Sequence, residues 1–172
     1  MRNLVFIASA AVLFAAATFL STVPVGAATP ATFTLTAGAL SISAPTAGVS
    51  LGSQVASTTS STISGSLGVV TVTDQRGGTT TWTASAISTA FTPPAGPADP
   101  ASNVSYGSGT ITVSATVVAT EVDETNLTGL STVVTGASTG ISTASWNPTI
   151  SVVVPANYAP GVYSATVTHS VA

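Results

Sequence analysis

The stretch LGVVTVTDQRGGTTTWTASA, residues 67–86, decides the class of fold. Valine alternates with threonine in its first half, a Gly-Gly pair follows two charged residues, and alternation resumes around Trp82. A period of two between apolar and polar residues is typical of a half-buried β-strand. We therefore predict two strands joined by a charged turn, as in a β-hairpin.

The turn of this hairpin carries an unusual share of the charge of the chain. Its sequence is Asp74-Gln75-Arg76-Gly77-Gly78, and the whole chain has only two Lys or Arg residues. An Asp side chain opens such a turn by accepting from backbone amides, and glycine adopts positive φ at no steric cost. We predict a structural turn formed by Asp74, Arg76, Gly77 and Gly78, with Arg76 also a candidate ligand contact.

Period-two alternation recurs along the rest of the chain, between segments rich in glycine and proline. The alternating segments are Thr32–Thr36, Leu40–Ser43, Gly109–Val118, Thr149–Val154 and Val162–Val171. Regularly spaced short strands predict a β-sandwich or barrel. We predict one all-β domain, a single antiparallel β-sandwich of the Ig-like or Greek-key type, with about 8–10 strands.

Two segments between the predicted strands are harder to interpret. Thr92–Asn103 is rich in proline, and we predict an exposed loop that connects the two sheets. Glu121–Gly140 is compatible either with a short strand pair around Leu130–Val134 or with an extended surface loop.

Residues 1–28 have the pattern of a secretory signal peptide. Arg2 supplies the positive start, Leu4–Leu20 is an apolar run, and Val25–Ala28 offers small residues for cleavage. We predict cleavage after Ala27 or Ala28, which leaves residues 29–172 as the exported domain. The alternative is an uncleaved membrane anchor, because the apolar run approaches spanning length.

The composition excludes several classes of partner. The formal net charge is −3, and Arg76 is the only Lys or Arg that remains once Arg2 is removed. Such a chain has no basic footprint for nucleic acid and no polybasic patch for anionic lipid. It has no cysteine, so disulfides play no part and stability must come from a buried core.

The titratable residues do not favour catalysis. His169 is the only histidine and cysteine is absent, which is too few ligands for zinc. A Ser-His-Asp set with Asp74 or Asp99 is numerically possible, but the sequence has no Gly-x-Ser-x-Gly elbow. The acidic segment Glu121–Asn126 lacks the spacing of a calcium-binding loop. We predict no catalytic residue, no metal and no cofactor.

Trp82 and Trp146 are the two tryptophans of the chain, and each has two possible roles. Exposed indole rings stack on sugars and would form a glycan platform, whereas buried indoles anchor the core of a sandwich. Trp82 would share a strand face with Ala84 and Ala86, which leaves room for its ring. Trp82, Trp146 and Arg76 are therefore the candidate ligand-binding residues, and the core role stays open for both tryptophans.

Several of these motifs together resemble the WxL domain of Gram-positive surface proteins. They are Val72–Gly77, Thr81–Ala84, Ser145–Thr149, Pro155-Ala156, Ala159–Tyr163 and Thr168–Val171. The resemblance covers residues 29–172 as a stand-alone domain. It implies a secreted β-sandwich held non-covalently on the cell wall, with peptidoglycan as ligand. The tryptophan motifs of the family correspond here to Trp82 and Trp146, although neither is followed by leucine two positions later.

We therefore expect a secreted, non-enzymatic cell-surface protein whose partners are cell-wall glycan or other surface proteins. The alternative function is a structural subunit of a surface layer, filament or spore coat that assembles through β-edge pairing. Edge strands are normally guarded by lysine, and this chain has none. A homo-oligomer is possible in that case. The sequence offers no sortase motif and no cysteine for a lipid anchor.

Overall fold

The computed structural model describes residues 26–172, and the predicted signal peptide lies almost entirely outside these residues. Residues 35–172 form one compact unit, and residues up to Thr34 belong to a separate one. The described part of that separate unit, residues 26–34, has no helix or strand, and each of its residues is exposed. None of the described helices is long and apolar enough to span a bilayer.

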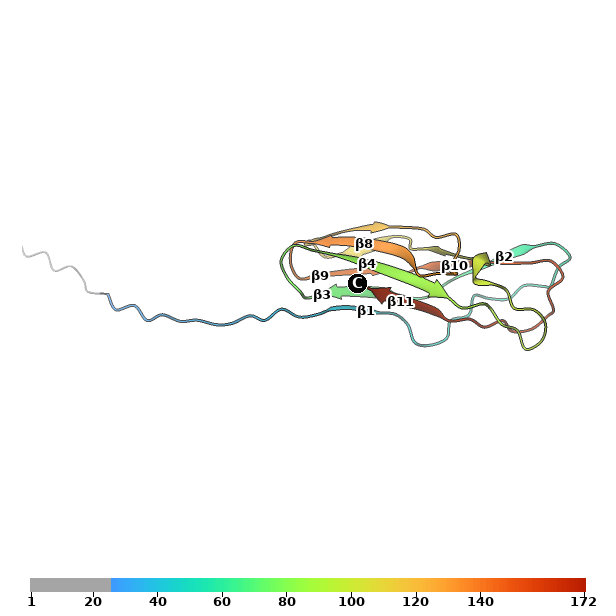
Figure 1. The fold of residues 1–172 in the computed structure, drawn as a ribbon, viewed down its shortest axis with the longest axis horizontal. Helices are drawn as coiled ribbons and strands as arrows, with labels where there is room; N and C mark the ends of the chain where they lie inside the picture. Colours follow the sequence, from blue (N-terminus) through green and yellow to red (C-terminus); the bar gives the residue numbers. More distant parts are fainter. Residues whose placement is uncertain (1–25) are drawn as a thin grey trace, which may run out of the picture. The chain divides into compact units, whose positions relative to one another are not determined.

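The compact unit is built of β-strands, which confirms the predicted all-β sandwich (Figure 1). Besides one short 3-10 helix at Ala101–Asn103, the described residues form eleven strands. The strands are β1 (Leu40–Ser43), β2 (Ser61–Ser66), β3 (Val70–Asp74), β4 (Thr80–Ser88), β5 (Val104–Gly107), β6 (Ile111–Val113), β7 (Val117–Glu121), β8 (Ser131–Ser138), β9 (Ser142–Trp146), β10 (Thr149–Val154) and β11 (Val167–Val171).

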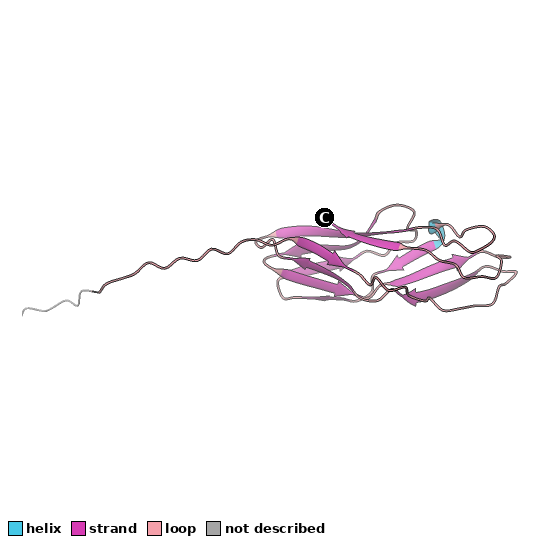
Figure 2. Ribbon diagram, turned by 90° about the horizontal axis from the view of Figure 1, so that it is seen from below, coloured by secondary structure: helices cyan, strands magenta, loops and turns pink. Residues whose placement is uncertain are grey.

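These strands form three antiparallel sheets, ordered β1-β3-β9-β6, β2-β10-β5 and β11-β4-β8-β7. The first two sheets continue one another, because β2 runs into β3, β5 into β6 and β9 into β10, in the same lateral order. They are one layer with a break across it, and the β11-β4-β8-β7 sheet is the other layer. Figure 2 shows the strands of the broken layer as two successive groups.

The break is a pair of β-bulges placed side by side. Three residues span the break in each of the two outer segments, residues 67–69 and residues 108–110. The central segment between β9 and β10 spans it with only two residues, 147–148. Each outer segment has a glycine at positive φ, Gly68 at 86° and Gly109 at 67°, as an extra residue in a bulge often requires. Because three long strands are each divided, the structure has more strands than the sequence predicted.

The predicted hairpin in residues 67–86 is wrong, although both of its strands are present. β3 pairs with β1 and β9, whereas β4 pairs with β11 and β8, so the turn carries the chain from one layer to the other. The physical reason is that each strand has one fully buried face. Val70, Val72 and Asp74 of β3 alternate with half-buried residues, as do Trp82 and Ala84 of β4. These faces meet across the core rather than edge to edge.

Three further predictions differ from the structure. Gly109–Val118 is two strands in different layers, since β6 pairs with β9 and β7 pairs with β8. Thr32–Thr36 alternates like a strand but has no strand partner among the described residues. Of Val162–Val171 only the second half, β11, is a strand. In each case the local pattern is that of a strand, and the available neighbour decides whether a strand forms.

Trp82 is buried over a glycine in the second layer. Its exposed fraction is 2%, and it lies directly opposite Gly136 of β8. A Cβ atom built on Gly136 would lie 2.1 Å from Cε2 of the indole, so only glycine leaves room for this ring. The indole Nε1 has no hydrogen-bond partner among the described residues, and the ring is therefore held by packing alone.

Replacement of Gly136 by alanine should destabilise the domain by about 3 kcal/mol, because either the indole or the β4–β8 ladder must shift. The measurement is urea unfolding followed by tryptophan fluorescence. Gly129→Ala is the control, because a Cβ at Gly129 meets nothing within 4 Å. Equal stability of the two variants would contradict this account of the packing.

Candidate functional site

The charged turn predicted from the sequence joins the two layers through one carboxylate. Asp74 is fully buried at the end of β3, and its oxygens accept from Arg76 Nε at 2.9 Å and Nη2 at 3.0 Å. The hydroxyl of Thr80 on β4 donates to the same carboxylate at 2.7 Å. Arg76 Nη2 also donates to the carbonyl oxygen of Thr81 at 2.9 Å. We call these four residues the Asp74 clamp.

The electrostatics of the clamp match a structural role. The hydrogen bond from the Arg76 side chain, supported by Thr80 and opposed by burial, holds the pKa of Asp74 well below its usual range. The same bond raises the pKa of the Arg76 guanidinium. Gly77 and Gly78 both have positive φ, 72° and 71°, which is the backbone conformation expected of the glycines in this turn. Nε and Nη2 of Arg76 therefore bind groups of this protein rather than a ligand.

Neither tryptophan presents a ring to solvent. Trp82 of β4 and Trp146 of β9 are each 2% exposed, and they come from opposite layers. The interpretation of these residues as an exposed glycan platform therefore gives way to the core interpretation. Both rings fill the interior that a chain without disulfides depends on for stability.

A chain of three hydrogen-bonded side chains crosses the core. Trp146 Nε1 donates to the hydroxyl oxygen of Tyr106 at 2.8 Å, and that oxygen lies 3.0 Å from Nε2 of His169. Tyr106 is on β5 and His169 on β11, so the chain joins the two layers a second time. An indole N–H only donates, and a hydroxyl has one hydrogen to give. We infer that Tyr106 donates to an unprotonated Nε2 and that His169 is neutral.

Burial shifts the pKa of both titratable members of this chain. It lowers the pKa of His169 and raises the pKa of Tyr106 to about 12, the latter opposed by the bond from Trp146. Both shifts favour the neutral form. A protonated His169 would point an N–H at a hydroxyl oxygen that already accepts from Trp146, leaving the hydroxyl hydrogen without this partner.

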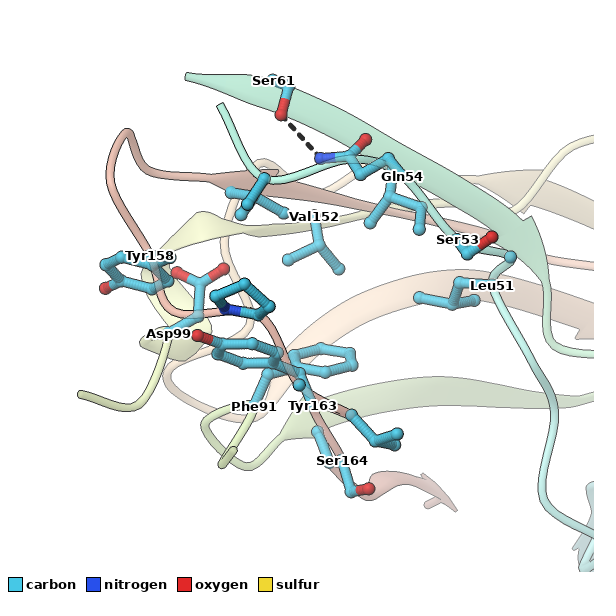
Figure 3. Close-up of a pocket in the computed structure, with 18 of the residues that line it drawn as sticks. Leu51, Ser53, Gln54, Ser61, Phe91, Asp99, Val152, Tyr158, Tyr163 and Ser164 are labelled. Atoms are coloured by element: carbon cyan, nitrogen blue, oxygen red, sulfur yellow. Dashed lines mark hydrogen bonds between the residues drawn. The ribbon is translucent and has the colours of Figure 1, made fainter. Parts of the chain in front are cut away.

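A groove with a volume of about 850 Å³ lies beside β2 (Figure 3). Residues 48–57 form one wall and residues 158–165 form the other. Its floor includes Ile63 of β2 and Val152 of β10. We call it the seam groove, because it lies between the edge strand of one layer and the chain that leads into β11 of the other.

Pro45 explains why the seam is open at this place. β1 pairs with β3 from Leu40 opposite Asp74 to Ser43 opposite Thr71, so its continuation would run along β2. Proline has no N–H for a sheet ladder, and β1 ends two residues before it. A Cβ on Gly68 would lie 2.8 Å from Pro45 Cγ, so the proline sits against the break itself. Beyond this point residues 48–57 lie against β2 without strand pairing, and no described strand occupies the position beside β2.

The seam groove combines aromatic rings with one buried acid. The rings of Tyr158 and Tyr163 stack with centroids 6.1 Å apart, and Phe91 lies beside them (Figure 3). Asp99 is 2% exposed and accepts from Asn103 Nδ2 at 2.6 Å. Burial raises the pKa of its carboxyl. The groove suits an uncharged ligand with apolar groups and hydrogen-bonding groups.

None of these residues was predicted from the sequence to form a binding site, although Asp99 was one possible triad acid and Tyr163 ended one of the quoted motifs. Asp99 lies within the predicted proline loop, where its backbone pairs with Phe91. Tyr158 and Tyr163 flank a proline turn far along the chain. The one available signal was the density of aromatic residues next to proline in these two loops, and it does not reveal that the loops meet.

The remaining candidate residues of the sequence make separate contacts in the described structure. In residues 26–172 no three His, Asp or Glu side chains lie close enough together to hold a metal ion. His169 bonds Tyr106, whereas Asp74 bonds Arg76, Thr80 and no histidine in the described chain. The acidic segment contributes to structure, because Asp123 Oδ1 accepts from the amide of Ser108 at 3.2 Å.

No family model, curated protein or solved structure matches this chain. The resemblance to the WxL domain stays a prediction that rests on the quoted motifs alone.

The stability of the domain should fall as the pH is lowered below about 6.5, the ordinary pKa of histidine. The unfolded chain binds this proton more readily than the folded one, so stability is complete above that pH and is lost towards the lower, folded-state pKa. The measurement is the free energy of unfolding in urea between about pH 5 and 7.5.

His169→Gln is the matched variant, because the amide oxygen can accept from Tyr106 and the side chain does not titrate. The carboxylates are the same in both proteins, so the difference between the two curves isolates the histidine. Parallel curves over this range would show that His169 is not held neutral by the core.

Proposed function

We propose that residues 29–172 form a secreted, non-catalytic structural protein of the cell surface, which assembles non-covalently through β-edge pairing. The observation that carries the proposal is the open position beside β2. Among the described residues, β2 exchanges strand hydrogen bonds with β10 alone. Edge strands with unpaired amides and carbonyls are ready sites for pairing with another chain.

The other strand edges are better covered. β1 lies close to β11, and β6 lies close to β7, so these edges meet across the two layers. The edge of β5 is covered where Tyr106 pairs with Glu124 in an isolated bridge. Only irregular chain, residues 48–57, lies beside β2, joined to it through Gln54 Nε2 and the hydroxyl of Ser61 at 2.6 Å.

The edge also lacks the usual protection against pairing. β2 reads Ser61-Thr-Ile-Ser-Gly-Ser66, without charge or proline. Natural sheets discourage edge pairing with lysine, proline or strong twist. Burial of both tryptophans supports the same function, since it favours a scaffold over an aromatic binding platform.

The assembly should weaken about tenfold when lysines are placed at Thr62 and Ser64, both exposed on β2. Sedimentation velocity over a concentration series measures it on the chain beginning at Thr29. Thr135→Lys is the control, because Thr135 is exposed on β8, which is paired on both sides. A wild-type chain that stays monomeric at high concentration would refute the proposed function.

Retention on the cell wall is the second candidate function, and the aromatic residues of the seam groove favour it. Tyr158, Tyr163 and Phe91 lie beside a hydrogen-bonding acid, which is a lining that suits a sugar. This candidate replaces Trp82 and Trp146 as ligand contacts, and it leaves Arg76 to the Asp74 clamp.

If the groove binds wall glycan, Tyr158→Ala and Tyr163→Ala should each reduce retention on purified cell walls several-fold. Leu130→Ala is the control, because this side chain is 65% exposed outside the groove. The measurement is a pull-down with purified walls. Unchanged retention of both folded tyrosine variants would exclude the groove as the wall-binding site.

A further inference from the structure

We propose that the position beside β2 is filled by residues 29–36 of a second copy of this chain, so that copies join head to tail. The inference rests on the proposed function and names the partner for the same edge. The two elements that carry it are a strand-like segment without a partner and an open strand position without an occupant.

The donor segment reads Thr29-Pro-Ala-Thr-Phe-Thr-Leu-Thr36. Phe33 and Leu35 alternate with threonines, so a strand formed here would have one apolar and one hydroxyl face. Their side chains are 91% and 84% exposed, the largest exposed fractions of Phe and Leu among the described residues. Isolated exposed apolar residues are common, but an alternating pair in an unpaired segment matches an intermolecular strand.

The acceptor has the features that such a strand needs. β2 offers a free backbone edge, and Ile63, Val152 and Phe91 provide an apolar surface next to it. The groove of about 850 Å³ is wide enough for an aromatic and an aliphatic side chain. Neither the donor segment nor the groove lining contains a lysine or arginine, so pairing meets no charge repulsion.

The donor segment cannot fill the groove of its own molecule. Gly38 is fixed to Gln75 at the far end of the β2–β3 ribbon, with its amide 2.8 Å from the Gln75 carbonyl oxygen. Ile63 lies about 40 Å along that ribbon from Gln75, at roughly 3.3 Å per residue. The five residue steps from Gly38 to Phe33 span at most about 18 Å. The partner must therefore be another copy.

The contact is heterologous, because the donor and the acceptor are different parts of the chain, and the chain joins the compact unit at Gly38, far along the β2–β3 ribbon from the acceptor. Each copy has one donor and one acceptor, so a copy can receive a donor from one neighbour and give its own to another. Heterologous contacts of this kind form rings or open filaments. We therefore expect linear or ring-shaped assemblies.

The first experiment uses the absence of cysteine from the chain. Chains carrying Phe33→Cys are mixed with chains carrying Ser61→Cys, which lines the groove, and oxidised. We expect the mixed disulfide dimer to form at least tenfold faster than in the matched mixture of Phe33→Cys with Thr135→Cys. Equal rates in the two mixtures would overturn the proposal, and so would an internal disulfide in a chain that carries both Phe33→Cys and Ser61→Cys.

The second experiment separates this inference from edge assembly in general. Phe33→Asp with Leu35→Asp should reduce association at least tenfold in sedimentation velocity, without a change in the urea midpoint. Val118→Asp with Leu130→Asp, at residues 75% and 65% exposed elsewhere, should leave association unchanged. Assembly that persists in the Phe33/Leu35 variant but fails in the Thr62/Ser64 lysine variant would overturn the donor segment and support edge pairing.

A third arm supplies the donor as a free peptide. A labelled peptide of residues 29–36 should bind the chain that begins at Ala37 and should protect its β2 edge, measured by fluorescence anisotropy and amide hydrogen exchange. The same peptide with Phe33→Asp should bind at least tenfold more weakly. Equal binding of the two peptides, or none by either, would overturn the proposal.

Discussion

The fold depends on the carboxylate of Asp74, because this residue lies at the turn where the chain passes from one layer to the other. A fully buried charge is costly unless it is paired and fully hydrogen-bonded. Here the carboxylate accepts from Arg76 in its own turn and from Thr80 in the opposite layer. The last Lys or Arg of the chain is thereby committed to structure rather than to a ligand. The Tyr106 hydroxyl joins the layers again, with uncharged partners on either side.

The sequence located some of the strands, including β3, β4 and β10, but it did not predict which strands are neighbours. Period-two alternation located β3 and β4 and the buried face of β4, because alternation reports which side chains point the same way. It does not report which strand lies alongside, so two strands in different layers were taken for a hairpin. Similarly, bulges at Gly68 and Gly109 divide long strands into two. These bulges depend on three neighbouring segments that lie side by side at the same position along the sheet.

The candidate site was less accessible to sequence reasoning, for the same reason. The turn chemistry of Asp74, Gly77 and Gly78 is local, and the structure confirms it. Whether Trp82 is exposed depends on what covers it, and Gly136, which leaves room for the ring, is far away in the sequence. The seam groove is assembled from loops around Leu51, Asp99 and Tyr158, each of which looks like an ordinary turn by itself.

The open position beside β2 follows from a few local features of the sequence. Pro45 stops β1 at the level where the outer strand bulges at Gly68, so the layer is four strands wide on one side of the break and three on the other. A chain that needed only a stable monomer would gain from a longer β1, which would bury Ile63 and pair β2. Retention of an unguarded edge, together with an unpaired alternating segment ahead of β1, is the arrangement expected when another chain completes the sheet.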